Sequence, residues 1–336
     1  MRLLRYIGRR LVFVVPQLIG IIVVSFFLIK LIPGDPAVLM LGPNATSDSI
    51  AALRDQLGLT KPLYEQILIY LGNVSHGNLG KSWQTAGNVA DDLLERFPAT
   101  LELVTLSMLL ALSIGIPLGT AAATRQRGAV RKLATYYGLL AGATPDFWLA
   151  LVLVFVFYSV LHVVPPPLGR LDVVISTPHA VTGSILIDSL LTGDLTATWS
   201  ALGHLLLPVL TLGLVSAGPI MKMTQSTMER TLASDFIRYA DICGLPRHVV
   251  RRQAFRASLP AIITIVSVLY SYLIGGAVLV EIVFSWGGAG QYAVQGVLNA
   301  DINPVLGFVI SAALLSLVLY LVVDLLYFAL DPRTRA

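Results

Sequence analysis

The residues of this chain that could do chemistry are few and far apart. Cys243 is the single cysteine, so neither an internal disulfide nor a cysteine-rich metal site can form. His162 and His204 have no cysteine, histidine or acidic neighbour at ligand spacing, and we therefore predict no metal site. The segment GNLGKSW (Gly77–Trp83) looks like the end of a phosphate-binding loop. Ser75 stands where that motif requires its first glycine, which favours a simple turn.

Two acids fall in or near apolar stretches, where a charge is costly and a functional role is the first hypothesis. Asp146 follows Pro145 in the segment ATPDFW. We favour the interpretation that this proline breaks a helix near the cytoplasmic interface, which leaves Asp146 hydrated or capping the next turn. The alternative is that Asp146 lines a gate or pathway. Glu281 lies near the outer end of another apolar stretch, where an interfacial anchor is favoured over a gating role.

Composition places the chain in a membrane. Of its 336 residues, 56% are hydrophobic and 12% are charged, and the mean hydropathy is +0.79. Soluble domains carry about 25% charged residues, so lipid must solvate much of this surface. No paired acids, Ser–Lys dyad or histidine cluster lies at a spacing typical of an active site, and we predict that the chain is not an enzyme.

Six stretches are long enough to cross a membrane as helices, which takes about 20 apolar residues. They lack Asp, Glu, Lys and Arg except for Asp146 in the third: Leu11–Ile29, Leu103–Thr124, Leu133–Leu161, Leu195–Met221, Ala257–Val280 and Ile302–Val323. A further charge-free run, Ile282–Ala300, is too polar and glycine-rich to span alone. The predicted fold is therefore an all-α integral membrane protein with six transmembrane helices.

Lys and Arg gather at the N-terminus, in residues 125–132, in residues 222–256 and at the C-terminus. Cytoplasmic segments of membrane proteins carry such an excess of positive charge, so both termini are predicted to be cytoplasmic. The predicted organisation is an N-terminal segment with the first helix (1–32), a small extracytoplasmic insert (33–98), a five-helix core (99–330) with a cytoplasmic loop at about 222–257, and a cytoplasmic tail (331–336).

The cytoplasmic loop contains the polar stretch SDFIRYADICGLPRHVV, which interrupts the apolar chain. Ser234 or Asp235 is a suitable N-cap, and Gly244 stands where a left-handed C-terminal cap is needed. One face of the intervening helix is predicted to carry four residues at helical spacing: Phe236, Tyr239, Ala240 and Cys243. Pro246 then suits the first turn of a second, basic helix.

Physical reasoning leaves two interpretations of this short helix open. It could lie on anionic lipid as an interfacial amphipathic helix. Alternatively, its small aromatic face, ended by a sharp glycine turn, could insert into a groove of a partner protein.

The segment RYADICG (Arg238–Gly244), with Pro260 downstream, resembles the "EAA" coupling loop of binding-protein-dependent ABC importer permeases. Other segments are similar to the peptide/nickel branch of that family, in the same order along nearly the whole chain: RYIGRRL (Arg5–Leu11), PGDP (Pro33–Pro36), LRDQLGLTKPLYEQ (Leu53–Gln66), GNLGKS, LLPVLTLGL (Leu206–Leu214), EIVFSWGGAGQYAVQGVLNAD (Glu281–Asp301) and DLLYFALDPR (Asp324–Arg333).

The resemblance implies a type I ABC importer fold in the cytoplasmic (inner) membrane of a bacterium or archaeon. A second homologous permease subunit would complete the pore, and two cytoplasmic ABC ATPases, or one fused pair, would drive it. An extracytoplasmic substrate-binding protein would deliver the solute. ATP and Mg²⁺ would belong to the ATPases, so this chain is expected to bind no cofactor. Its other contacts would be membrane lipid, with no nucleic acid.

The resemblance also assigns site residues. In relatives, Ala240 and Gly244 correspond to small positions of the loop, and Phe236 and Tyr239 would face the ATPase groove. The implied coupling residues are Asp235, Phe236, Arg238, Tyr239, Ala240, Asp241, Cys243 and Gly244. The fifth helix commonly lines the pathway in relatives, which makes Tyr270, Gly275 and Gly276 pathway candidates, weighed against ordinary packing. With the two acids Asp146 and Glu281, they complete the set of pathway or gate candidates.

This sequence departs from the family pattern at a few positions. Asp241, Ile242 and Cys243 stand where relatives more often carry a basic, a small and a basic residue, and this charge pattern would select a particular ATPase. The expected function is that of a peptide importer permease. Alternatives are the same machinery for nickel or another small solute, or a secondary transporter, although the latter requires a chain of buried ionisable groups.

Overall fold

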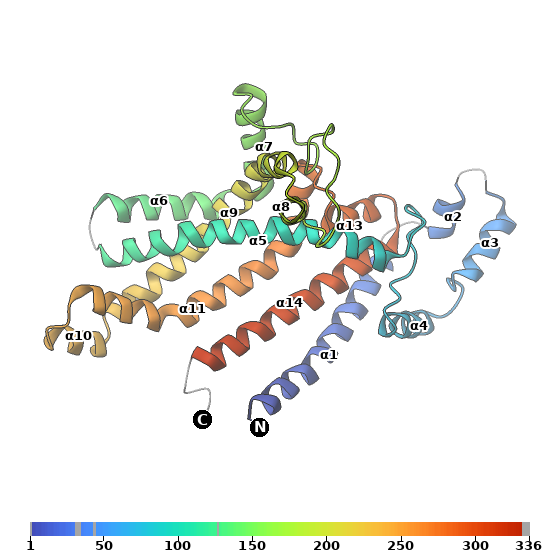
Figure 1. Ribbon diagram of the computed structural model, residues 1–336. Helices are drawn as coiled ribbons and strands as arrows, with labels where there is room; N and C mark the ends of the chain where they lie inside the picture. The colour runs from blue at the N-terminus through green and yellow to red at the C-terminus, as the bar shows by residue number, and fades with distance from the viewer. Residues whose placement is uncertain (1, 31–34, 43–44, 126–127, 331–336) are drawn as a thin grey trace. The chain divides into compact units, whose positions relative to one another are not determined.

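The structure is a computed structural model that describes residues 2–30, 35–42, 45–125 and 128–330, and within these ranges it contains helices and no named strand (Figure 1). The helices are α1 (Arg2–Lys30), α2 (Pro36–Leu41), α3 (Ser47–Gln56), α4 (Leu63–Ser75), α5 (Val89–Thr124), α6 (Ala129–Ala143), α7 (Asp146–Leu153), the π-helix η1 (Val154–Val160), α8 (Ile185–Thr192), α9 (Leu195–Leu232), α10 (Asp235–Ile242), α11 (Arg247–Gly276), α12 (Val278–Val283), α13 (Ala289–Leu298) and α14 (Ile302–Leu330). The predicted tail, residues 331–336, and the first half of PGDP lie outside the described residues.

Four of the described helices are long and apolar enough to cross a membrane, namely α5, α9, α11 and α14. The bent pair of α6 with α7 and η1 makes a fifth if it is counted as one span. The predicted first span falls within α1, whose described apolar stretch, Val14–Leu28, is shorter than a full span. The all-helical membrane character is therefore confirmed, and the count of six spans stays a prediction.

The third predicted span is not one straight helix. Its two halves, α6 and α7–η1, are bent by 102° at the break between them. Thr144 is extended at φ −90° and ψ 118°, and Pro145 follows it as the N-cap of α7. Proline has no N–H and disfavours a helical conformation at the residue before it, so α6 cannot continue through this point.

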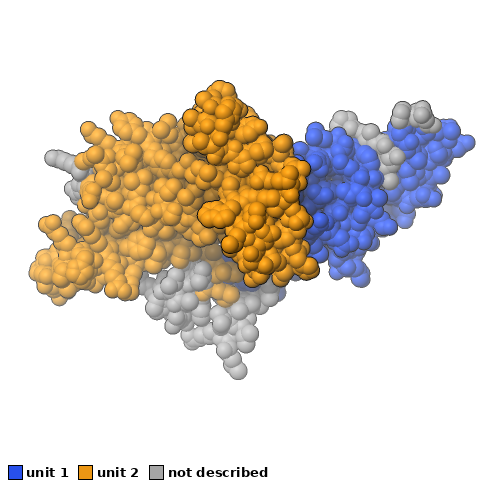
Figure 2. All heavy atoms as spheres, turned by 45° about the horizontal axis from the view of Figure 1, so that its top comes forward, with its two compact units in different colours: residues 1–98, 287–321 blue, residues 99–286, 322–336 orange. Residues whose placement is uncertain are grey.

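The chain divides into two compact units, which Figure 2 shows in different colours. The first unit contains residues 1–98 and 287–321, and the second contains residues 99–286 and 322–336. Within the first unit, Phe26 of α1, Ile67 of α4 and Leu306 of α14 form a buried apolar cluster. In the same unit, Thr46 caps α3 by accepting a hydrogen bond from the Ser49 amide at 3.3 Å.

Helix α9 is the packing centre of the second unit and contacts α6, α7, α8 and α11. Glycine permits the closest of its approaches. A Cβ atom placed on Gly119 of α5 would lie 2.6 Å from the carbonyl oxygen of Met221, and one on Gly218 would lie 2.6 Å from the Cβ of Ala141. Membrane helices associate through small residues of this kind, because close backbones gain dispersion contacts that lipid cannot match.

Candidate functional site

Helix α10 is anchored by two buried residues and presents the rest of its surface to solvent. Ile237 and Ala240 are 2% and 5% exposed, and they join a buried cluster with Ala123 of α5, Met228 of α9, and Val250 and Ala254 of α11. The short helix is therefore seated where the ends of three long helices meet.

The exposed side of α10 is apolar and aromatic. Phe236, Tyr239 and Ile242 are 51%, 70% and 83% exposed, and Leu245 follows at 39%. Asp241 and Cys243 are exposed as well. The predicted face is corrected in one residue, because Ala240 turns inward beside Ile237 instead of joining Phe236 and Tyr239. Its small side chain lets α10 pack closely on the cluster.

The two caps of α10 differ in how well the sequence predicts them. Ser234 is the N-cap, but its hydroxyl donates to the Thr231 carbonyl at 2.5 Å and accepts nothing from the first turn. At the other end, Gly244 is left-handed at φ +72°. The Leu245 amide donates to the Ala240 carbonyl at 3.1 Å and the Gly244 amide to the Asp241 carbonyl at 3.0 Å. These two bonds form the paired C-terminal cap that glycine allows.

Charged groups around α10 are open to solvent. Arg238 and Asp235 lie 3.8 Å apart, but both are largely exposed, so this ion pair contributes little to stability. Pro246 is the N-cap of α11, just outside the helix rather than in its first turn. The first turns of α11 carry the exposed residues Arg247, Arg251 and Arg252. The arrangement offers a partner an apolar aromatic patch with a basic border.

Glu281 is fully buried, not an interfacial anchor. Its Oε1 accepts a hydrogen bond from the hydroxyl of Thr100 on α5 at 2.5 Å, and its backbone carbonyl accepts one from the Trp286 amide at 2.8 Å. The indole of Trp286 donates in turn to the Ala99 carbonyl at 2.9 Å. Glu281 lies in the short helix α12, close to its end, but residues that are distant in the sequence pack around it and bury it.

The other pathway candidates are spread along the chain. Asp146 is the half-buried first residue of α7, where the free amides of the first turn favour a negative charge. Tyr270 contacts Thr105 through a 2.8 Å bond between their hydroxyls. Gly275 is exposed, and Gly276 lies against the ring of Tyr272. The structure does not gather these residues into one cluster, and their role in a pathway stays a prediction.

Two residues that matter for this geometry are absent from the sequence predictions. Ile237, the main anchor of α10, is hidden in the sequence because it is the only large apolar residue on that side of an eight-residue helix. Glu102 is buried within α5, one residue before the charge-free stretch counted as the second span. An acid next to such a stretch is a signal that could have indicated it.

Comparison with known proteins covers nearly the whole chain. The family model described as "Binding-protein-dependent transport system inner membrane component" matches residues 115–336. The model for the N-terminal part of the membrane component of the same kind of system matches residues 3–104. The first match contains α10 and the whole of its supporting cluster.

Several relatives are similar to this chain over nearly their full length. The probable D,D-dipeptide transport system permease protein DdpB of Escherichia coli is 40% identical over 94% of this chain and 92% of its own. The di/tripeptide transport system permease protein DppB of Pseudomonas aeruginosa is 38% identical over 99% of both chains. The dipeptide transport system permease protein DppB of Alkalihalophilus pseudofirmus is 34% identical over 99% of this chain. By these matches, the chain belongs to the family of inner membrane components of binding-protein-dependent transport systems.

Proposed function

We propose that this chain is a permease subunit of an ABC importer for di- or oligopeptides and forms half of the translocation pathway. Family membership supports the importer role, and the names of the relatives support the peptide substrate. The observation that carries the mechanism is the seat of α10, which exposes Phe236, Tyr239 and Ile242 while Ile237 holds it at the junction of three long helices.

Energy from ATP would reach the pathway through α10. The exposed aromatic side chains insert into a groove on a cytoplasmic ATPase, and the rigid Gly244 cap keeps them at a fixed angle. When the ATPase pair closes on ATP and Mg²⁺, α10 moves with it, and the buried cluster passes the shift to α5, α9 and α11. This chain does no covalent chemistry. The exposed basic start of α11 favours an ATPase surface with acidic residues around the groove.

The proposed topology has six spans with both termini in the cytoplasm. Helix α1 supplies the first span, the bent α6–α7 segment supplies the third, and residues 33–98 form the insert outside. The distribution of Lys and Arg along the sequence supports this orientation. The proposed partners are a second homologous permease subunit, two ABC ATPases or one fused pair, and an extracytoplasmic binding protein, in the cytoplasmic membrane of a bacterium or archaeon.

Uptake by a deletion strain tests the substrate. A strain lacking this subunit should lose uptake of a radiolabelled dipeptide and regain it when the chain is supplied on a plasmid, while uptake of nickel ions is unchanged. Intact dipeptide uptake together with lost nickel uptake would instead assign the chain to nickel import. Dipeptide uptake that collapses with the proton gradient but persists without ATP would indicate a secondary transporter.

A further inference from the structure

Glu102 is a buried acid that the coupling mechanism does not use. It lies in the outer part of α5, and its side chain is 4% exposed. Burying a carboxylate is costly unless specific donors compensate the charge. The groups that donate hydrogen bonds to Glu102 are therefore the ones that this residue holds in place.

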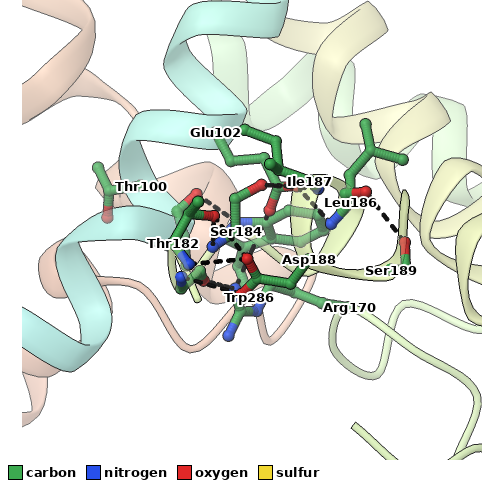
Figure 3. A network of polar contacts seen from close by, with 12 residues as sticks. Thr100, Glu102, Arg170, Thr182, Ser184, Leu186, Ile187, Asp188, Ser189 and Trp286 are labelled. Atoms are coloured by element: carbon green, nitrogen blue, oxygen red, sulfur yellow. Dashed lines mark hydrogen bonds and ion pairs between the residues drawn. The ribbon is translucent and has the colours of Figure 1, made fainter. Parts of the chain in front are cut away.

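The donors come from the segment between η1 and α9, as Figure 3 shows. One oxygen of Glu102, Oε1, accepts hydrogen bonds from the Ser184 hydroxyl at 2.7 Å and from the Leu186 amide at 3.0 Å. The other oxygen, Oε2, lies 4.0 Å from Nη1 of Arg170. Ser184 is the N-cap of α8, so Glu102 places a negative charge at the amino end of that helix, where the helix dipole favours it.

The segment that Glu102 holds is itself tightly organised. Asp188 of α8 accepts hydrogen bonds from the Thr182 amide and hydroxyl, both at 2.8 Å, and from the Gly183 amide at 3.0 Å. Burial raises the pKa of Asp188, but these hydrogen bonds outweigh burial and hold the pKa below its usual value. Ser189 accepts a hydrogen bond from Thr198 of α9 at 3.0 Å. Residues 182–192 therefore form one piece fixed to the start of α9.

The same turn of α5 also holds a second segment. Ala99 and Thr100, which come shortly before Glu102, bond Trp286 and Glu281. The Gly169 amide, next to Arg170, donates to the carbonyl of Phe284 at 3.0 Å. One turn of α5 thus fastens residues 169–192 and residues 281–286 together.

We propose that Glu102 is a positioning residue for transport: its bonds to Ser184 and Leu186 and its ion pair with Arg170 latch residues 170–192 onto α5. The latch makes the outer part of α5, the α8 segment and the start of α9 move as one body. This inference builds on the proposed function, because the latched segment lies on the side where a binding protein would deliver substrate. The latch itself is measurable without any transport.

Trypsin provides that measurement, because Arg170 is the only Lys or Arg between Lys132 and Lys222. Fragments that end at Arg170 or begin at Leu171 identify this cut in the purified full-length chain, and its rate reports the fraction of chains with this segment open. We expect Glu102→Ala to raise the rate about tenfold or more, since tenfold corresponds to about 1.4 kcal/mol. Glu102→Gln, which keeps one acceptor oxygen, should give a smaller increase, and Ser184→Ala should also raise the rate.

Two controls separate the latch from general unfolding. Glu95→Gln removes an exposed charge from the same helix and should leave cleavage after Arg170 unchanged. Cleavage after the exposed Arg238 should stay at the wild-type rate in every variant. If Glu102→Ala raises both cleavage rates, this variant unfolds generally, and the milder variants Glu102→Gln and Ser184→Ala then test the latch. Cleavage after Arg170 at the wild-type rate in these two variants would overturn the latch.

Transport then tests the positioning role. In vesicles with the complete importer, Glu102→Gln should raise the dipeptide concentration for half-maximal uptake at least about threefold, with maximal uptake retained, since delivery from outside is loosened and ATP coupling is not. If cleavage after Arg170 is faster but the dipeptide concentration for half-maximal uptake is unchanged, the positioning role is rejected and the latch is a structural contact only. Absence of dipeptide uptake in the wild type would contradict the proposed function, without affecting the cleavage result.

Discussion

Substitution of Gly244 should uncouple α10 from its partner through backbone strain alone. Gly244 adopts φ +72°, and a Cβ atom added there would meet no atom within 4 Å. An L-residue in this left-handed conformation costs about 1–2 kcal/mol. The ratio of molecules without the cap to molecules with it therefore rises about 5- to 30-fold over the wild type. Asparagine tolerates the conformation better, and a β-branched residue tolerates it worst.

The expected order of dipeptide-stimulated ATPase activity is therefore wild type, Gly244→Asn, Gly244→Ala and Gly244→Val, from highest to lowest. The assay uses the reconstituted importer at fixed permease content, and membrane insertion is checked by the yield of purified chain. Gly72→Ala is the matched control, because Gly72 lies inside α4 with open space around its Cβ position and needs no left-handed backbone. Wild-type ATPase activity in Gly244→Val, or lower activity in Gly244→Asn than in Gly244→Val, would show that the left-handed cap at Gly244 does not control coupling.

Three further predictions concern single contacts. Ile237→Ala should lower the thermal stability of the solubilised chain, with a loss of about 2–5 kcal/mol expected for a buried site. Ile242 is 83% exposed, so Ile242→Ala should leave stability unchanged but weaken ATPase binding. Equal shifts of the melting temperature in the two variants would contradict the burial pattern. Gly119→Ala should destabilise the chain by about 1–3 kcal/mol through overpacking, read by the same melting assay, because its Cβ would lie 2.6 Å from a carbonyl oxygen of α9. The hydrogen bond from Arg54 lowers the pKa of Asp35, so their ion pair stabilises the folded chain above about pH 4. This stabilisation is lost as the pH falls through the lowered pKa of Asp35. Hydrogen exchange should show that amide protection of α2 and α3 decreases in this pH range in the wild type but not in Asp35→Asn.

Short-range signals predicted much of this structure. The helix end at Gly244 and the break at Pro145 depend on local backbone chemistry, and both occur as expected. The sequence also predicted the exposed aromatic pair of α10. These features can be read because a cap or a proline acts within a few residues of its own position.

Features that depend on distant partners were mispredicted or missed. The burial of Ala240 is set by side chains of α5, α9 and α11, and no local pattern encodes them. The burial of Glu281 depends on Thr100, which is 181 residues away. Glu102 was missed for the same reason, because its donors belong to a segment more than 80 residues further along the chain. Pro145 predicts the break in the third span, but no local signal predicts the 102° angle of the bend.

In the proposed complex, α10 faces the cytoplasm and an ATPase covers it, and labelling of Cys243 can test this arrangement. This exposed thiol is the only cysteine in the chain, so a membrane-impermeant maleimide reports one position in the unmodified protein. We predict labelling in inside-out vesicles stripped of ATPase, protection when the ATPase subunits are added back, and no labelling in right-side-out vesicles. Labelling from the outer side, or labelling in inside-out vesicles that the ATPase does not slow, would show that α10 does not dock on a cytoplasmic ATPase.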